Sequence, residues 1–176
     1  MMRIFIFLSI LFLISCNSTQ DKGKVYEAGA FPYAIHEKVL TNGLKVLAVP
    51  FDSPGLVTYS TVIQAGSRDE IEKGVTGFAH FFEHLMFYGS EKYPKAKIKK
   101  INKSLAAGGN ANTTNDRTFY YLTGNAKKLE TFFQVASDNF RHLKLSQAEF
   151  KKEAGAVLGE YTKNFSSWYR QLDAKM

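Results

Sequence analysis

Cysteine is almost absent from this chain of 176 residues, since Cys16 is the only one. A single cysteine excludes an internal disulfide, so the fold cannot depend on covalent cross-links. A membrane-spanning run is missing as well. The main apolar run, from Ile4 to Ile14, is too short to cross a bilayer.

Acidic residues are the minority, with 16 Asp and Glu against 23 Lys and Arg, and the formal net charge is +7. The basic residues cluster once, in KYPKAKIKKINK, residues 92–103. A nucleic-acid surface needs aromatic residues interleaved with the basic ones, and Tyr93 is the only aromatic residue in this cluster. We therefore interpret the cluster as a solvated helix face and expect no nucleic-acid partner.

The first sixteen residues have the pattern of an export signal, in which Arg3 precedes the apolar run. The run ends in Leu-Ile-Ser-Cys, which resembles the bacterial lipobox, where cleavage precedes the cysteine and its sulfur receives a diacylglycerol. The alternative is an ordinary secretory signal with an incidental cysteine. Because Cys16 lies at the one place a lipobox requires it, we expect residues 1–15 to be a lipoprotein signal peptide. The mature chain is then lipid-anchored in the bacterial cell envelope, on the periplasmic or extracellular side of a membrane.

The rest of the chain predicts one α+β domain of ordinary size. Residues 16–33 are expected to form a polar tether, and residues 34–176 a folded part. Strands followed by helices, then a strand and further helices, favour a two-layer domain with helices on one face of a largely antiparallel sheet. The predicted strands are a hairpin over 34–50, Gly55 to Gly66 and 117–124, and the predicted helices are Gly74 to Tyr88, Lys95 to Ala107, Leu129 to Leu143 and Ser146 to about Asn164.

Three features of this pattern depend on specific residues. Asn42-Gly43 between two alternating apolar runs predicts the turn of the hairpin, because both residues tolerate positive φ. Ser146 with Glu149 three residues later predicts a capping box. The stretch GGNANTTND, residues 108–116, indicates a loop or an irregular strand.

Two histidines and a glutamate interrupt the aromatic stretch FAHFFEHLMFYG, residues 78–89, which predicts a helix that is apolar nearly all round and buried. In a helix His80 and His84 lie on one face, where they can share a metal ion. Glu83 lies at the edge of that face, where it can reach a water molecule without ligating the metal. The alternative is that both histidines are ordinary core residues, which would leave three buried polar groups in need of hydrogen-bond partners. A metal ion with its bound water would give partners to all three. Zinc suits imidazole ligands.

A catalytic zinc site needs a third protein ligand. The last predicted helix offers Glu149, Glu153 and Glu160. Glu153 and Glu160 are two turns apart and share a face, so that one could ligate zinc while the other orients a histidine ring. The alternative is that both carboxylates are solvated.

The order His-x-x-Glu-His reverses the commoner motif of zinc peptidases. With its surroundings it resembles the pitrilysin and insulysin family of inverted-motif zinc metallopeptidases, which includes the mitochondrial processing peptidases. The similarity runs from about Val39 to Asn164. The stretches that carry it are LTNGLKVLAVP, QAGSRDE, GFAHFFEHLMFYGS and GGNANTTNDRTFYYL, followed by the two glutamates seven residues apart.

The resemblance implies a zinc ion bound by His80, His84 and Glu160, with Glu83 as the general base that passes a proton to the leaving amine. It implies that Glu153 does not bind the metal but holds one of its ligands in place. It also implies that Asn110 and Ala111 bind a peptide or protein substrate, which adds as a strand beside them.

Members of that family contain two or four domains of this kind, so the chain corresponds to the N-terminal part of one domain, incomplete at its C-terminus. We expect a zinc endopeptidase, or its zinc-bearing portion, with a C-terminal half or a partner subunit. One alternative is a catalytically incomplete peptide-binding lipoprotein, which would not need Glu83. Another is the S-ribosylhomocysteine lyase family, which shares the motif but ligates zinc through a cysteine. Cys16 lies in the export signal, which argues against that family.

Overall fold

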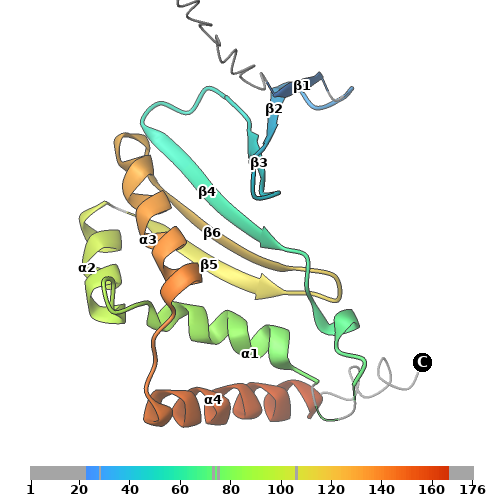
Figure 1. The fold of residues 1–176 in the computed structure, drawn as a ribbon, viewed down its shortest axis with the longest axis vertical. Coiled ribbons are helices and arrows are strands. Elements are labelled where there is room, and N and C mark those ends of the chain that lie inside the picture. Colours follow the sequence, from blue (N-terminus) through green and yellow to red (C-terminus); the bar gives the residue numbers. More distant parts are fainter. Residues whose placement is uncertain (1–22, 28, 73, 75, 106, 167–176) are drawn as a thin grey trace, which may run out of the picture. The chain divides into compact units, whose positions relative to one another are not determined.

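The computed structural model describes residues 23–166 apart from 28, 73, 75 and 106 (Figure 1). The chain divides into two compact units, one up to Asp52 and one from Ser53 onward, and each is described by itself. The predicted signal peptide, Cys16 and the first residues of the predicted tether lie outside the described residues. Within the described part of the chain, no helix combines the length and the apolar character needed to cross a membrane.

The first unit is an antiparallel sheet of β1 (Lys24–Glu27), β2 (Ala34–Val39) and β3 (Lys45–Ala48), in the order β1-β2-β3. The hairpin turn predicted at Asn42-Gly43 is confirmed. Gly43 has φ 84°, and the Asn42 side chain accepts a hydrogen bond from the Leu44 amide at 3.1 Å. Because β1 pairs with β2, the stretch expected to be a tether contains a strand, and the exact domain boundary stays a prediction.

The second unit is built on an antiparallel sheet of β4 (Leu56–Ile63), β5 (Gly108–Thr113) and β6 (Thr118–Asn125), in the order β4-β6-β5. The start of GGNANTTND, predicted to be a loop or an irregular strand, is therefore a regular strand. Hydrogen bonds along all of β5 to β6 override its weak strand propensity. Among the described strands β5 pairs only with β6, so it is an edge of this sheet.

Among its described residues, the second unit contains four helices and three single 3₁₀ turns. Their bounds are α1 (Phe78–Leu85), α2 (Lys95–Ser104), α3 (Leu129–His142), α4 (Gln147–Phe165), η1 (Ser67–Asp69), η2 (Met86–Tyr88) and η3 (Ala126–Lys128). The α+β fold class predicted from the sequence is confirmed. The strands form two sheets of three, and in the second unit α1 lies between the sheet and α4 (Figure 1).

The core of the second unit lies where α1 and α3 cover the sheet. Phe132 of α3 is only 2% exposed, and it packs so closely on Gly124 of β6 that a Cβ there would lie 2.9 Å from its ring. Leu85 of α1 and Ala111 of β5 are also buried. Burial of a phenylalanine side chain contributes about 1.5–3 kcal/mol, so Phe132 is a main anchor of α3 on the sheet.

The helix that carries the histidines is shorter and less buried than the sequence predicted. It begins at Phe78 rather than near Gly74, because Gly77 before it has φ 95°, which a helix cannot continue through. Phe78 is 45% exposed and Phe82 54% exposed. The expectation of a helix buried nearly all round was therefore wrong, because the sheet and α4 cover only part of its surface.

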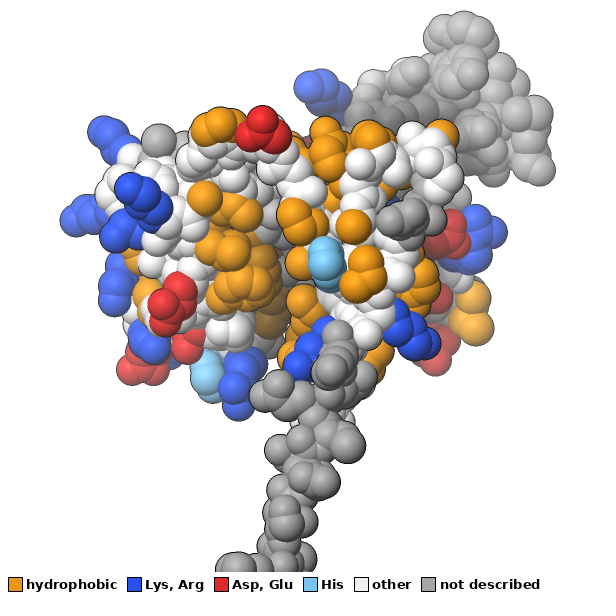
Figure 2. All heavy atoms as spheres, turned by 90° about the horizontal axis from the view of Figure 1, so that it is seen from above, with side chains coloured by type: hydrophobic (Ala, Val, Ile, Leu, Met, Phe, Trp, Pro, Cys, Tyr) orange, Lys and Arg blue, Asp and Glu red, His pale blue; other side chains and the backbone are white. Residues whose placement is uncertain are grey.

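Hydrophobic side chains gather in patches on the face drawn in Figure 2.

Hydrogen bonds join α3 to the segment that follows α1. Ser90 donates a hydrogen bond to Asp138 of α3 and accepts one from the Tyr93 amide at 2.9 Å. The bond from Ser90 is the main reason why the pKa of Asp138 lies below its usual range, with His142 adding to the effect. Ser146 and Glu149 form the predicted capping box at the start of α4. These contacts hold α3 to the segment after α1 and set the residue at which α4 begins.

Candidate metal centre

The start of α1 is held by the loop before it. Glu70 accepts hydrogen bonds from the amides of Gly77 at 2.5 Å and Ala79 at 2.6 Å, which satisfies donors that an α-helix leaves free at its N-terminus. Arg68 in the same loop pairs with Asp116 at 2.6 Å, in the turn between β5 and β6. The segment QAGSRDE therefore ties α1 to the end of the β5–β6 hairpin.

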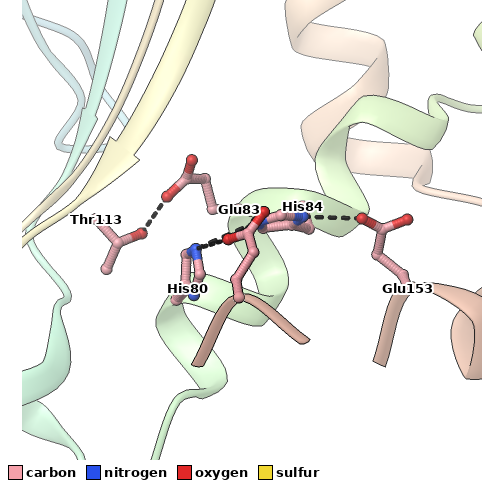
Figure 3. Close-up of polar contacts among 6 residues, drawn as sticks. His80, Glu83, His84, Thr113 and Glu153 are labelled. Carbon is pink, nitrogen blue, oxygen red and sulfur yellow. Dashed lines mark hydrogen bonds and ion pairs between the residues drawn. The ribbon is translucent and has the colours of Figure 1, made fainter. Parts of the chain in front are cut away.

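His80 and His84 lie one turn apart on α1, with their rings edge-to-face and 4.7 Å between ring centroids. Their Nε2 atoms face each other at 3.1 Å. Glu160 of α4 places Oε2 at 3.6 Å from each of these nitrogens. The structure therefore brings together His80, His84 and Glu160, for which a shared metal ion was predicted. Figure 3 shows the two histidine rings on α1.

These three spacings fit a tetrahedral zinc ion. Ligand atoms about 2.0–2.2 Å from a tetrahedral centre lie about 3.3–3.6 Å from one another. The measured separations of 3.1, 3.6 and 3.6 Å lie close to that range, without any rearrangement of α1 against α4. Two neutral imidazoles and one carboxylate are also a ligand set that zinc accepts.

Glu153, one of the three glutamates left open by the sequence, contacts the other side of His84. Its Oε1 lies 2.8 Å from Nδ1 of His84 (Figure 3). Its Oε2 accepts a hydrogen bond from the Tyr88 hydroxyl at 2.7 Å. Burial raises the pKa of Glu153, but the hydrogen bonds from Tyr88 and His84 outweigh it, so that the pKa lies below its usual range. The same bond to Glu153 raises the pKa of Tyr88 to about 12. Glu153 is therefore placed to orient a ligand, and Glu149 caps α4 away from the histidines.

Glu83 is the most enclosed carboxylate of the group, with 7% exposure. Thr113, the last residue of β5, donates a hydrogen bond to its Oε2 at 2.6 Å. This bond holds one carboxylate oxygen and leaves the other available. Glu83 is not one of the three residues whose ligand atoms converge, which agrees with the separate role expected for it.

A cleft at the edge of β5 contains these side chains. It is lined by the two histidines, Glu83, Glu153 and Glu160 from the helices, by residues 110–113 of β5, and by Lys95 at the start of α2. Asn110 is exposed and Ala111 is buried, at 8% exposure. Both predicted substrate residues therefore border the cleft with the candidate metal ligands.

Sequence reasoning did not single out several residues of this site, among them Thr113, Tyr88 and Lys95. Assigning residues 108–113 to a regular strand would have revealed Thr113, because alternation then places it on the same face as Ala111. Tyr88 lies four residues after His84, but no spacing rule indicates that it reaches a residue of α4. For Lys95 we identify no sequence signal beyond its charge.

Comparison with known proteins identifies the family of the chain. The family model described as Insulinase (Peptidase family M16) matches residues 52–176, which include every candidate metal ligand. The chain belongs to this family. The resemblance inferred from the sequence is thereby confirmed, and the second unit is an M16 peptidase domain.

Three curated proteins illustrate what the chain is similar to. The chain is 34% identical over 123 residues to the bovine mitochondrial-processing peptidase subunit beta, covering 69% of this chain and 24% of the relative. It is 32% identical over 127 residues to the zinc protease PqqE of Helicobacter pylori, covering 71% and 28%. It is also 32% identical over 129 residues to subunit 1 of the human mitochondrial cytochrome b-c1 complex, covering 73% and 26%. The chain thus spans about a quarter of these relatives.

A solved structure supports the same fold. The crystal structure of a protease from Helicobacter pylori matches with a TM-score of 0.67 and 29% identity. The match covers 72% of this chain and 30% of that one. The architecture described above is therefore that of part of an M16 protease.

Proposed function

We propose that the chain is the zinc-bearing part of an M16 endopeptidase that hydrolyses peptide bonds in a peptide or protein substrate. One observation carries the proposal. The Nε2 atoms of both histidines and a carboxylate oxygen of Glu160 converge at separations suited to zinc, beside the buried carboxylate of Glu83.

Each residue of the site has a distinct task in this proposal. His80, His84 and Glu160 would hold zinc, which would supply the Lewis acidity that lowers the pKa of water and polarises a peptide carbonyl. Glu83 accepts the proton of the attacking water and passes it to the leaving amine. The hydrogen bond from Thr113 holds one oxygen of the Glu83 carboxylate at the end of β5 and leaves the other oxygen available for the proton.

The substrate in this proposal is an extended peptide that lies along β5. A strand at the edge of a sheet presents unpaired main-chain groups, to which an extended peptide can bond as an additional strand. Asn110 and Ala111 are on this edge and border the same cleft as the candidate metal ligands. Remaining contacts would come from a C-terminal half or a partner subunit, since the matched stretch makes up only about a quarter of each relative.

A second function within the family is binding without catalysis. The similarity to a subunit of the cytochrome b-c1 complex motivates it, because that name specifies no peptidase activity. The presence of both histidines, Glu83 and Glu160 in one cleft favours the peptidase proposal, because a protein that only binds peptides has no use for a buried carboxylate beside a metal site.

Zinc binding by the purified chain tests the proposal directly. We expect one zinc per chain, because a single set of three converging ligands lies within the described residues. Elemental analysis of protein prepared without a histidine tag measures the ratio, and hydrolysis of unstructured peptides is assayed on the same samples. A chain that folds but binds no zinc would contradict the proposal.

The proposed location is a bacterial membrane surface, with Cys16 as the lipid anchor. Cys16→Ser is expected to move the expressed protein out of the detergent phase or to leave its signal uncut, because serine offers no sulfur for acylation. Detergent partitioning and the mass of the mature N-terminus measure the effect. Ser18→Ala, two residues further on, should behave as the wild type. Equal partitioning of both variants, with cleavage at another site, would indicate an ordinary signal peptide.

A further inference from the structure

Tyr88 is a buried tyrosine whose hydroxyl bonds to Glu153, the carboxylate that contacts His84. It ends η2, which directly follows α1, and it is 8% exposed. We propose that Tyr88 is a positioning residue of the metal centre, which holds Glu153 so that Glu153 orients His84. This inference rests on the proposed zinc site and adds a residue to it.

The first step of the argument is the double attachment of the Glu153 carboxylate. Its Oε1 contacts His84 and its Oε2 contacts Tyr88, at 2.8 and 2.7 Å. The terminal torsion of a glutamate is broad, so one hydrogen bond leaves the carboxylate plane free to turn. Two bonds to two oxygens fix that plane. Because His84 and Tyr88 belong to consecutive helical turns of one segment, both bonds join that segment to α4.

The second step concerns the tautomer of His84. A neutral imidazole has one N–H and one lone pair, and the partner of the N–H decides which nitrogen can ligate a metal. With a carboxylate at Nδ1, the proton resides there, and the lone pair lies on Nε2, the atom that faces His80 and Glu160. A carboxylate free to turn would favour this tautomer less strongly.

The third step is that Tyr88 is itself held in place. The ammonium of Lys95 lies 4.2 Å from the centroid of the Tyr88 ring, in the arrangement of a cation–π contact. Gly89, the next residue, has φ 84° and approaches the Tyr93 carbonyl so closely that a Cβ would lie 2.1 Å from its oxygen. The Tyr88 hydroxyl therefore belongs to a side chain that its neighbours hold in place.

Tyr88→Phe removes the hydroxyl and keeps the ring and its contact with Lys95. We expect the zinc affinity of this variant, measured by competition with a chromophoric chelator, to fall about 3- to 10-fold. The visible spectrum of the cobalt-substituted protein should shift, because it reports the orientation of the histidine ligands. Tyr93→Phe is the matched control. Tyr93 is buried on the neighbouring turn, and among the described residues no hydrogen bond of its hydroxyl is found. Its affinity and spectrum should equal those of the wild type.

A double-mutant cycle separates positioning from general stability. Tyr88 acts through Glu153, so adding Tyr88→Phe to Glu153→Ala should cause no further loss of zinc affinity, although each single change causes one. Equal zinc affinity in Tyr88→Phe and Tyr93→Phe, or full additivity with Glu153→Ala, would overturn the inference. Either result would leave the proposed function intact. That function fails separately, if the wild type binds no zinc.

Discussion

Glu83→Gln is expected to retain zinc and to lose about two to four orders of magnitude in peptide hydrolysis, the typical cost of removing a general base. Glutamine has nearly the same size, and its carbonyl oxygen can still accept the hydrogen bond from Thr113. What it cannot do is accept a proton. Zinc content and turnover are measured on the same samples, in whatever assembly the wild type is active, including fusion to a complete C-terminal half from the family.

Glu160→Gln is the contrasting change. It replaces an anionic carboxylate oxygen, 3.6 Å from both Nε2 atoms, by a neutral amide oxygen, which is a weaker metal ligand. We expect zinc occupancy to fall first, at limiting zinc, and hydrolysis to fall with it. The two variants therefore separate the base from the ligand by which quantity is lost.

The control for both variants is Glu130→Gln, on the exposed side of α3, where Glu130 contacts only Gln134 among the described hydrogen bonds. It should keep both zinc and turnover. If Glu83→Gln emptied the site while Glu160→Gln left it full, the two roles would be assigned the wrong way round. If both variants kept zinc, Glu153 would become the leading third ligand.

Replacing either histidine should have the largest effect on metal binding. His80→Ala and His84→Ala each remove one of three converging ligand atoms. Loss of an outer hydrogen-bond partner typically costs about 10- to 100-fold in metal affinity, and loss of a ligand itself should exceed about 100-fold. Zinc affinity is measured by chelator competition, and the zinc content after dialysis by elemental analysis.

His36→Ala is the matched control, because His36 is an exposed histidine on β2, outside the unit that carries the site. It should bind zinc as the wild type does. Thermal unfolding of the metal-free proteins shows whether the α1 variants still fold. Unchanged zinc content in a folded His80→Ala or His84→Ala protein would refute the site.

Local patterns in the sequence were sufficient for several parts of the fold. Asn42-Gly43 predicted the hairpin turn, and Ser146 with Glu149 predicted the start of α4. In each case the deciding interaction joins residues at most a few positions apart, so it is recorded in the spacing. The shared face of His80 and His84 belongs to the same class, because helix geometry alone places residues four apart on one side.

The sequence by itself thus determined the motif, the fold class and a short choice of third ligands. The family resemblance implied that Glu160 ligates zinc and Glu153 supports it. Only the tertiary structure supplied the contacts of these glutamates with the histidines, since those depend on the packing of α4 against α1. Glu153 and His84 are 69 residues apart, and Thr113 and Glu83 are 30 apart. The sequence also did not predict that α1 begins after Gly77. It did not predict how much of the α1 surface the sheet and α4 leave exposed. Such contacts depend on how whole elements pack against each other, and no periodicity along one element records that.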